Sequence, residues 1–335
     1  MISPAKIQTA AFDVAEWEVD SEFGIFPQGA RAKEAVFAPD PPPESVIIPN
    51  RRYLFKRSRE RYPDQFWAEI VAYRVGCLMG VEVPPAFAAW NSRTGISAAL
   101  IEWFYVDGNE SFIWGGDLLM KLRPGFDRKT GAQHNLKDNT VLMRAFAKTK
   151  AFHTNWRQWW VDALLFDALI GNWDRHQDNW GLIFGPTGIR LSPLFDNGTA
   201  LGHDRVCAKF RGWHDRDVDG YIERGRHHLK WSLDQQGQLL GGIGEAPIGI
   251  GNPKWAMNGK EPPNGHLNLL RRALAEWPET CQTASQRLSF SATDLSEALS
   301  DLTTLDVPMR LSPERWAFML RLLKRRYELL KLLFE

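Results

Sequence analysis

The stretch Gly171-Asn-Trp-Asp-Arg-His-Gln-Asp-Asn179, followed by Leu194-Phe-Asp-Asn-Gly198, decides which fold the sequence predicts. The segment between them is rich in strand-forming residues on both sides of Gly185-Pro-Thr-Gly188, a typical turn sequence. We therefore expect a β-hairpin over residues 180–191, with polar residues just before and just after it. The apolar segment ahead of Gly171 predicts a helix over residues 155–170, which the glycine would end.

Three polar side chains in these stretches form the set that phosphoryl transfer from ATP requires. The carboxylate of Asp174 would orient or deprotonate the attacking hydroxyl. The amide oxygen of Asn179 and the carboxylate of Asp196 would hold Mg²⁺ against the phosphates. The spacing from Asp174 to Asn179 equals that of Asp-x-x-x-x-Asn in the kinase catalytic loop, so the sequence predicts a phosphotransferase that uses ATP and Mg²⁺.

The order Asp174-Arg-His176 reverses the His-Arg-Asp of that loop, and here the chain resembles the HipA-like serine/threonine kinase family, which is related to the phosphatidylinositol 3/4-kinases. Leu191-Ser-Pro-Leu-Phe-Asp196 is similar to the HipA-type metal-binding motif. The resemblance covers residues 28–330, although only residues 171–198 carry it specifically. It implies a serine/threonine protein kinase, and it makes His176 a second candidate for the catalytic base.

A cation for the phosphates is predicted in the first part of the chain. Lys56 ends a short apolar strand, and Glu69 follows inside a predicted helix. An ion pair of this type orients the lysine toward the α- and β-phosphates. The alternatives are an ordinary surface lysine at a strand end and a solvated helix glutamate.

A phosphate-binding loop should precede that lysine, and Gln28–Lys33 is the best candidate. Glycine permits a close backbone approach, and exposed N–H groups bind anions. The loop has one glycine and lacks the string Gly-x-Gly-x-x-Gly, so it departs from the eukaryotic type. The residues predicted to contact the nucleotide here are Gly29, Arg31 and Lys33.

The segment Leu100–Phe104 is the candidate hinge. Backbone groups around Glu102 and Phe104 would bind adenine there, and a plain buried strand is the alternative.

The order of predicted elements indicates an α+β, two-lobed protein-kinase-like fold. Residues 1–106 would form a small, mainly-β N-lobe that binds the nucleotide and has one helix. Residues 107–335 would form a larger, mainly-α C-lobe with the catalytic loop and the metal site. In the N-lobe we expect strands at 45–48, 53–56, 86–90 and 97–105, and a helix over 64–79 with Asp64 as its N-cap. In the C-lobe we expect helices at 140–150, 155–170, 293–302 and 312–334.

Composition narrows the class of protein further. The chain has 335 residues, 44% of them hydrophobic, and a net charge of +1, which gives no support for direct nucleic-acid or membrane binding. The cysteines Cys77, Cys207 and Cys281 are widely separated and suit a reducing compartment. No signal peptide or membrane span is visible, so we expect the bacterial cytosol, while delivery into a host cell by another route stays open.

Two rival functions remain. A phosphoinositide kinase would need a cationic pocket for the head group, and the near-neutral charge balance offers none. A catalytically silent pseudokinase is disfavoured because all three polar residues of the catalytic set are retained. The resemblance implies a protein substrate with a Ser or Thr acceptor, self-phosphorylation as an option, and a toxin with an antitoxin partner or a bacterial effector. The adjacent His227 and His228 should diverge on a regular element, so they predict no metal site.

Overall fold

The computed structural model describes residues 5–21, 32–233 and 262–335. The chain forms two compact units. The first unit comprises Met1–Phe104, Asn197–Gly212 and Ser291–Arg321, and the second comprises Tyr105–Asp196, Trp213–Phe290 and Leu322–Glu335. The first unit therefore includes two late segments of the chain. These units reflect packing within the chain, and they do not test the predicted boundary between the two lobes at residue 106, which stays a prediction.

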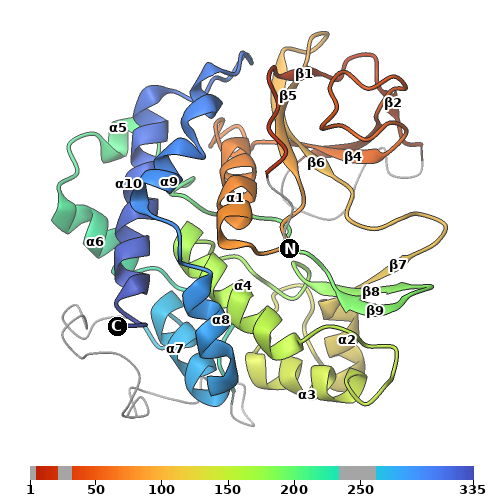
Figure 1. The fold of residues 1–335 in the computed structure, drawn as a ribbon, viewed down its shortest axis with the longest axis vertical. Helices are drawn as coiled ribbons and strands as arrows, with labels where there is room; N and C mark the ends of the chain where they lie inside the picture. Colours follow the sequence, from red (N-terminus) through yellow and green to blue (C-terminus); the bar gives the residue numbers. More distant parts are fainter. Residues whose placement is uncertain (1–4, 22–31, 234–261) are drawn as a thin grey trace. The chain divides into compact units, whose positions relative to one another are not determined.

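A six-stranded sheet forms the centre of the first unit (Figure 1). Its strand order is β1-β5-β6-β4-β3-β2, and β1 pairs in parallel with β5 while the other neighbours are antiparallel. The strands are β1 Phe12–Asp13, β2 Glu18–Val19, β3 Lys33–Phe37, β4 Arg52–Arg57, β5 Ala86–Asn91 and β6 Ile96–Glu102. The strands predicted at residues 53–56 and 86–90 are confirmed, and the one predicted at 97–105 is present but ends at Glu102.

The predicted strand at residues 45–48 is wrong, because this segment forms a turn. The backbone N–H of Ile47 donates to the carbonyl of Glu44 at 3.0 Å, and Asn50 has a left-handed φ of 57°. The Ile47 side chain is nevertheless only 1% exposed. The apolar residues that indicated a strand therefore contribute to the core from a turn.

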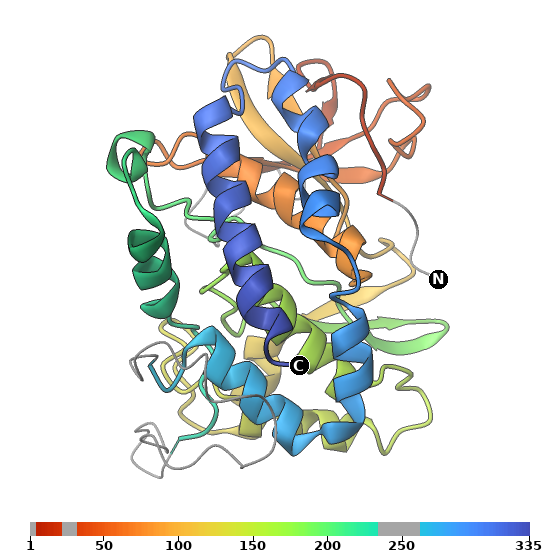
Figure 2. The same ribbon diagram turned by 60° about the vertical axis from the view of Figure 1, so that its left-hand side comes forward.

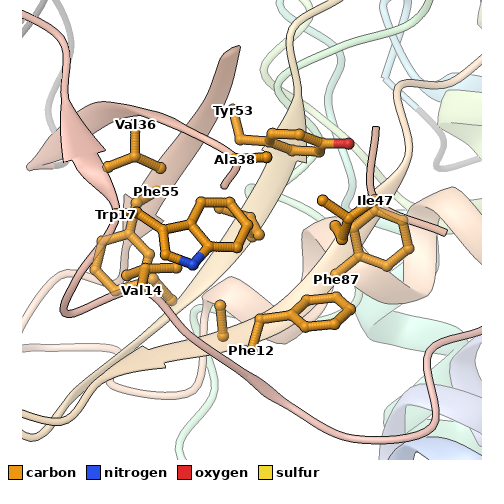
Figure 3. Close-up of a cluster of buried hydrophobic side chains, with 12 residues drawn as sticks. Phe12, Val14, Trp17, Val36, Ala38, Ile47, Tyr53, Phe55 and Phe87 are labelled. Atoms are coloured by element: carbon orange, nitrogen blue, oxygen red, sulfur yellow. The ribbon is translucent and has the colours of Figure 1, made fainter. Parts of the chain in front are cut away.

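Aromatic and aliphatic side chains of the sheet and of the loops beside it converge in one core (Figure 3). Trp17 packs edge-on against Tyr53 with ring centroids 6.1 Å apart, and Phe12 packs against Phe87 at 5.7 Å. Burial of a large apolar side chain contributes about 1.5–3 kcal/mol. This core therefore fixes β4, the strand that carries Lys56, against its neighbours.

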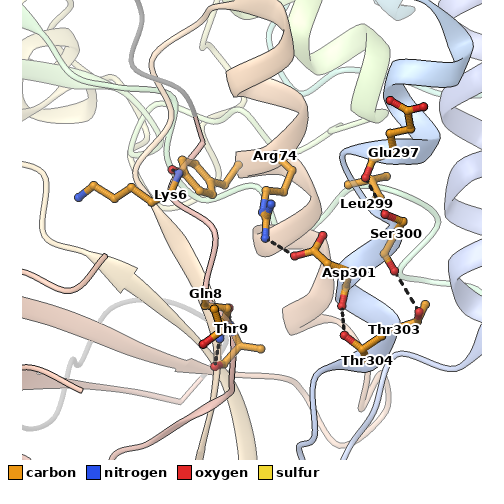
Figure 4. Close-up of polar contacts among 12 residues, drawn as sticks. Lys6, Gln8, Thr9, Arg74, Glu297, Leu299, Ser300, Asp301, Thr303 and Thr304 are labelled. Carbon is orange, nitrogen blue, oxygen red and sulfur yellow. Dashed lines mark hydrogen bonds and ion pairs between the residues drawn. The ribbon is translucent and has the colours of Figure 1, made fainter. Parts of the chain in front are cut away.

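Helix α1, Phe66–Met79, packs against β5 and β6 and carries Glu69 in its first turn (Figure 1). It ends at Gly80, which has the left-handed φ of 67° that favours glycine. Arg74 binds Asp301 at 2.7 Å and so ties α1 to the 3₁₀ helix η3, Ser300–Thr304 (Figure 4). The N-cap residue is Gln65, so the predicted N-cap Asp64 is wrong, and the carboxylate of Asp64 binds Arg315 instead.

The second unit is mainly helical and is built around α4, Trp156–Ile170 (Figure 1, Figure 2). The residues of α4 from Trp160 to Ile170 are buried. Helices α7, His266–Glu276, and α8, Cys281–Gln286, pack against α4. A small sheet has the order β7-β8-β9, and its strands β8, Gly181–Gly185, and β9, Gly188–Leu191, confirm the predicted hairpin.

The other elements are β7 Ser111–Trp114, α2 Gly115–Leu122, α3 Leu136–Phe146, α5 Cys207–Phe210, α6 Asp215–Glu223, η2 Pro278–Thr280, α9 Ala292–Glu297 and α10 Pro313–Lys331. The predicted helix at residues 140–150 corresponds to α3, which begins and ends four residues earlier, and the one at 293–302 divides into α9 and η3. Among the described residues, no helix has the length and apolar content needed to cross a membrane.

Candidate active site

The predicted catalytic loop begins where α4 ends. Gly171 takes a left-handed φ of 68°, and an added Cβ would lie 2.6 Å from the guanidinium of Arg326. The buried side chain of Asn172 turns the chain: its Nδ2 donates to Asp167 at 3.1 Å, and its Oδ1 accepts the N–H of Asp174 at 3.1 Å. The loop that carries Asp174 is therefore fixed from its first residues.

A buried ion pair holds the middle of this loop. Arg175 is 1% exposed and donates two hydrogen bonds to the carboxylate of Asp167, at 3.0 and 2.6 Å. Its Nη1 donates to the backbone carbonyls of Phe195, at 2.6 Å, and Asn179, at 3.3 Å. One guanidinium thus connects α4, the end of the loop and the residue before Asp196.

The carboxylate of Asp167 also accepts a hydrogen bond from Nε2 of His227 at 3.1 Å. Burial alone would raise the pKa of Asp167, but the charge of Arg175 and the hydrogen bonds from His227 and Arg175 lower this pKa to about 2. Asp167 is therefore ionised at neutral pH and serves as the common anchor of Asn172, Arg175 and His227.

We expect the stability of the protein to fall as the pH drops from about 4 to about 2 through protonation of Asp167. Its pKa is about 2 in the folded protein and 3.8 as the ordinary value, so its ionised form stabilises the fold above pH 3.8. This contribution, about 2 kcal/mol, is lost as the pH falls through the folded pKa. Urea unfolding of wild type and Asp167→Asn at several pH values measures it. An equally steep acid loss in the variant would contradict the assignment.

The two predicted metal ligands lie at the ends of the hairpin. Asn179 is buried and its Nδ2 donates to the carbonyl of Asp174 at 2.6 Å, so its Oδ1 is the end left to face a metal. Asp196 has a φ of 57°, an uncommon left-handed conformation for a residue other than glycine. Such backbone strain persists where the surrounding structure imposes it, often at functional sites.

The oxygens of Asn179 and Asp196 are of the chemical kind that Mg²⁺ binds together with a nucleotide. Within residues 5–21, 32–233 and 262–335, no group of three or more His, Cys, Asp or Glu side chains could hold a metal ion. A dedicated all-protein metal cage is therefore not formed by the described residues. Mg²⁺ is usually held by one or two carboxylates together with substrate phosphates, and one carboxylate and one amide oxygen match that pattern.

The predicted Lys–Glu ion pair is present in the first unit. Nζ of Lys56 lies 2.8 Å from Oε1 of Glu69, and the two side chains are 5% and 3% exposed. Oε2 of Glu69 accepts the backbone N–H of Asn197 at 2.8 Å. Lys33 stands directly opposite Lys56 in the β3–β4 pair, so both side chains leave the same face of the sheet. The solvated alternatives for Lys56 and Glu69 are therefore wrong.

At the candidate hinge, the last residue of β6, Glu102, pairs with a proline. The N–H of Glu102 donates to the carbonyl of Pro85 at 2.8 Å, but proline has no N–H to return the bond. The sheet therefore supplies no donor to the carbonyl of Glu102 on this side. The Glu102 side chain is held by Lys6 at 2.6 Å. Phe104 is partly exposed just after the strand.

The second candidate base, His176, has one of its two ring nitrogens engaged by the backbone. Its Nδ1 accepts the N–H of Asp178 at 3.1 Å, so the neutral ring carries its proton on Nε2 and has no free acceptor there. Its ring centroid lies 5.9 Å from that of His228, whose pKa burial lowers to about 4. The predicted loop residues Gly29 and Arg31 lie outside the described residues.

Several residues of this arrangement were not predicted from the sequence. Each of them binds a partner elsewhere in the chain. Asp167 lies 8 residues from Arg175, His227 lies 60 residues from Asp167, and Pro85 lies 17 residues from Glu102. One signal was present: Asp167 is a charged residue in an otherwise apolar part of the helix. A buried charge needs a partner, so such a residue points to a structural or functional ion pair.

Comparison with solved structures identifies the fold class. The proinflammatory kinase CtkA of Helicobacter pylori superposes with a TM-score of 0.65 at 16% identity, covering 96% of each chain. HipA of Shewanella oneidensis MR-1, solved with HipB and operator DNA, gives a TM-score of 0.42 at 15% identity, covering 92% of this chain and 66% of that one. The Golgi casein kinase gives 0.37 at 11%, covering 97% and 72%. No protein-family model and no curated protein sequence matches the chain.

The likeness to the first of these structures confirms the predicted two-lobed α+β protein-kinase-like fold.

Proposed function

We propose that the protein is an ATP- and Mg²⁺-dependent kinase that phosphorylates Ser or Thr hydroxyls of proteins. The observation that carries this proposal is the buried ion pair of Lys56 and Glu69, in which Glu69 also binds the backbone of Asn197. Burial of a lysine and a carboxylate carries a desolvation cost, so such a pair is weak evidence for stability alone and is consistent with a functional role. The likeness to a structure described as a proinflammatory kinase supports the same activity.

Each of the named side chains would contribute a separate part of the chemistry. Asp174 accepts or orients the proton of the acceptor hydroxyl, since its loop is fixed by Asn172 and Arg175. Lys56 binds the phosphates while Glu69 keeps its ammonium group in place. Catalysis of this kind depends mainly on positioning and on charge stabilisation.

The donor groups of Asn179 and Asp196 would hold Mg²⁺, which supplies charge neutralisation at the phosphates. Adenine would bind at the hinge, because the carbonyl of Glu102 lacks a donor from Pro85 and can accept the exocyclic amine. Phe104 would supply a second backbone group there. Lys33, on the same sheet face as Lys56, would add positive charge for the phosphates.

The class of acceptor, the partner and the location are proposed from the sequence. A protein acceptor is proposed over a phosphoinositide because one carboxylate suffices to position an alcohol, whereas a lipid head group needs a cationic pocket. An antitoxin partner, a toxin or effector role and a cytosolic location stay predictions drawn from the resemblance to HipA-like kinases.

One experiment separates these functions. The purified protein is incubated with γ-labelled ATP and Mg²⁺ alone, with a bacterial lysate, and with phosphoinositide vesicles. Asp174→Asn, prepared in the same way, reports any contaminating kinase. We expect label on Ser or Thr of a protein, located by mass spectrometry. Label on lipid alone would replace the proposal with a lipid kinase, and no label in any arm would leave a pseudokinase.

We expect Lys56→Met to reduce kcat/KM by about 100-fold or more, because it removes the positive charge proposed to stabilise the phosphates in the transition state. Glu69→Ala should lose less, since ATP phosphates partly replace its charge. Glu69→Gln should fall between wild type and Glu69→Ala because the amide oxygen still accepts the N–H of Asn197. Steady-state kinetics on variants with matched melting temperatures measure this series. A Lys56→Met variant within about threefold of wild type would contradict the phosphate-binding role.

A further inference from the structure

The start of α1 is held by distant segments and not by a local cap. Gln65, its N-cap residue, makes no capping bond to the helix with its side chain. The N–H of Phe66 instead donates to Oγ of Ser58 at 2.8 Å, and Nε2 of Gln65 donates to the carbonyl of Gly198 at 3.0 Å. The position of α1, and with it that of Glu69, therefore depends on the segment that follows Asp196.

Arg315 of α10 connects these same parts of the first unit. It is 1% exposed and binds the carboxylate of Asp64 with two donors, at 2.6 and 3.2 Å. Its other donors bind the carbonyls of Gly202, at 3.1 Å, and Arg205, at 2.5 Å. One planar guanidinium thus joins the residues just before α1 to the segment 202–205.

Aromatic side chains fix the guanidinium in this position. The rings of Phe210 and Phe318 stack with centroids 3.9 Å apart, and the guanidinium carbon of Arg315 lies 5.2 Å from the centroid of Phe210. Arginine can bind a carboxylate with two parallel donors while it contacts an aromatic ring, which lysine cannot reproduce. The site is therefore specific for arginine and not only for a positive charge.

The segment held by Arg315 offers almost no acceptor for a regulatory phosphate. Residues 197–212 contain one hydroxyl side chain, that of Thr199, and it is only 8% exposed. In many kinases this part of the chain is ordered by a phosphate that pairs with arginine. Here carbonyl groups of the segment bind an arginine directly.

We propose that Arg315 is a positioning residue that keeps the Lys56–Glu69–Asn197 arrangement assembled without phosphorylation of residues 197–212. The proposal rests on the kinase function proposed above. Arg315 holds Asp64 at the start of α1, and it holds the segment whose first residue, Asn197, binds Glu69. Loss of these contacts frees α1 from the segment and moves Glu69 away from the Asn197 amide.

The test compares Arg315→Lys and Asp64→Asn with Arg325→Gln, after treatment of each protein with a phosphatase. Asp64→Asn is the milder variant because Asp64 is 18% exposed and the carbonyl contacts of Arg315 remain. Arg325 is a matched control on the same helix, where it binds Asp219 at 2.6 Å. Two readouts are taken: kcat and KM for ATP, and amide hydrogen exchange at residues 197–205.

We expect the phosphatase-treated wild type to remain active. Arg315→Lys should lower kcat about tenfold or more with KM for ATP within about threefold, because positioning acts mainly on the transition state. Exchange at 197–205 should accelerate about tenfold or more in Arg315→Lys, less in Asp64→Asn, and not in Arg325→Gln.

Two results would overturn the proposal: kcat and exchange in Arg315→Lys equal to those of Arg325→Gln, or loss of wild-type activity on phosphatase treatment. Hydrogen exchange needs no phosphoryl transfer. If the wild type transfers no phosphate at all, the kinase function fails, while the exchange rates still decide whether Arg315 holds the segment.

Discussion

Asp196→Asn should abolish phosphoryl transfer, with kcat reduced by about 1,000-fold or more, and should also weaken nucleotide binding in the presence of Mg²⁺. The substitution keeps the shape of the side chain but removes the charge of the only carboxylate assigned to the metal. Asp174→Asn should abolish transfer to a similar degree and still bind the nucleotide, because Asp174 is assigned to the acceptor hydroxyl. The two variants are therefore expected to fail in different ways.

Calorimetric titration with a non-hydrolysable ATP analogue, with and without Mg²⁺, distinguishes the two cases. Asp306→Asn is the control, since Asp306 is 80% exposed and binds the exposed side chain of Arg310. Turnover near that of wild type in Asp196→Asn would refute the metal assignment. Equal Mg²⁺ dependence of binding in both variants would refute the division of roles.

Arg175→Met should lower the free energy of unfolding by about 3–5 kcal/mol, the largest stability effect that we expect. It leaves the fully buried carboxylate of Asp167 without its main partner and removes the donors to Phe195 and Asn179. Urea denaturation measures the loss. Arg287→Met is the matched control, because Arg287 also binds an aspartate of α4, Asp162, but at a partly exposed position.

The control should lose about 1 kcal/mol or less, as expected for an ion pair that water can reach. A loss in Arg175→Met no larger than in the control would show that the buried pair is not the anchor of the loop. An activity lost far beyond the fraction unfolded would show in addition that Arg175 positions Asn179.

The residues that could be predicted from the sequence are those whose spacing is set by local structure. The hairpin between Asn179 and Asp196 follows from its turn residues, and the helix that carries Glu69 ends at Met79 as predicted. The pairing of Lys56 with Glu69 was predicted from order along the chain and is confirmed at 2.8 Å.

The residues that could not be predicted depend on partners far away in the chain. Arg315 lies 251 residues from Asp64, and no periodicity or spacing relates two such positions. The missed role of Pro85 has a similar cause, because its effect appears only once β5 and β6 are in register. The error at residues 45–48 arose because strand-forming side chains can reach a core from a turn.

The first unit is assembled from early and late segments of the chain, and this has a consequence for its folding during synthesis. The six-stranded sheet is translated early, but α1 is held by Asp301 and, through Asp64, by Arg315, which are among the last residues of that unit to leave the ribosome. A nascent chain that ends before these residues lacks the contacts that fix Glu69. The first unit can therefore complete the contacts around Glu69 only after almost all of its residues have been translated.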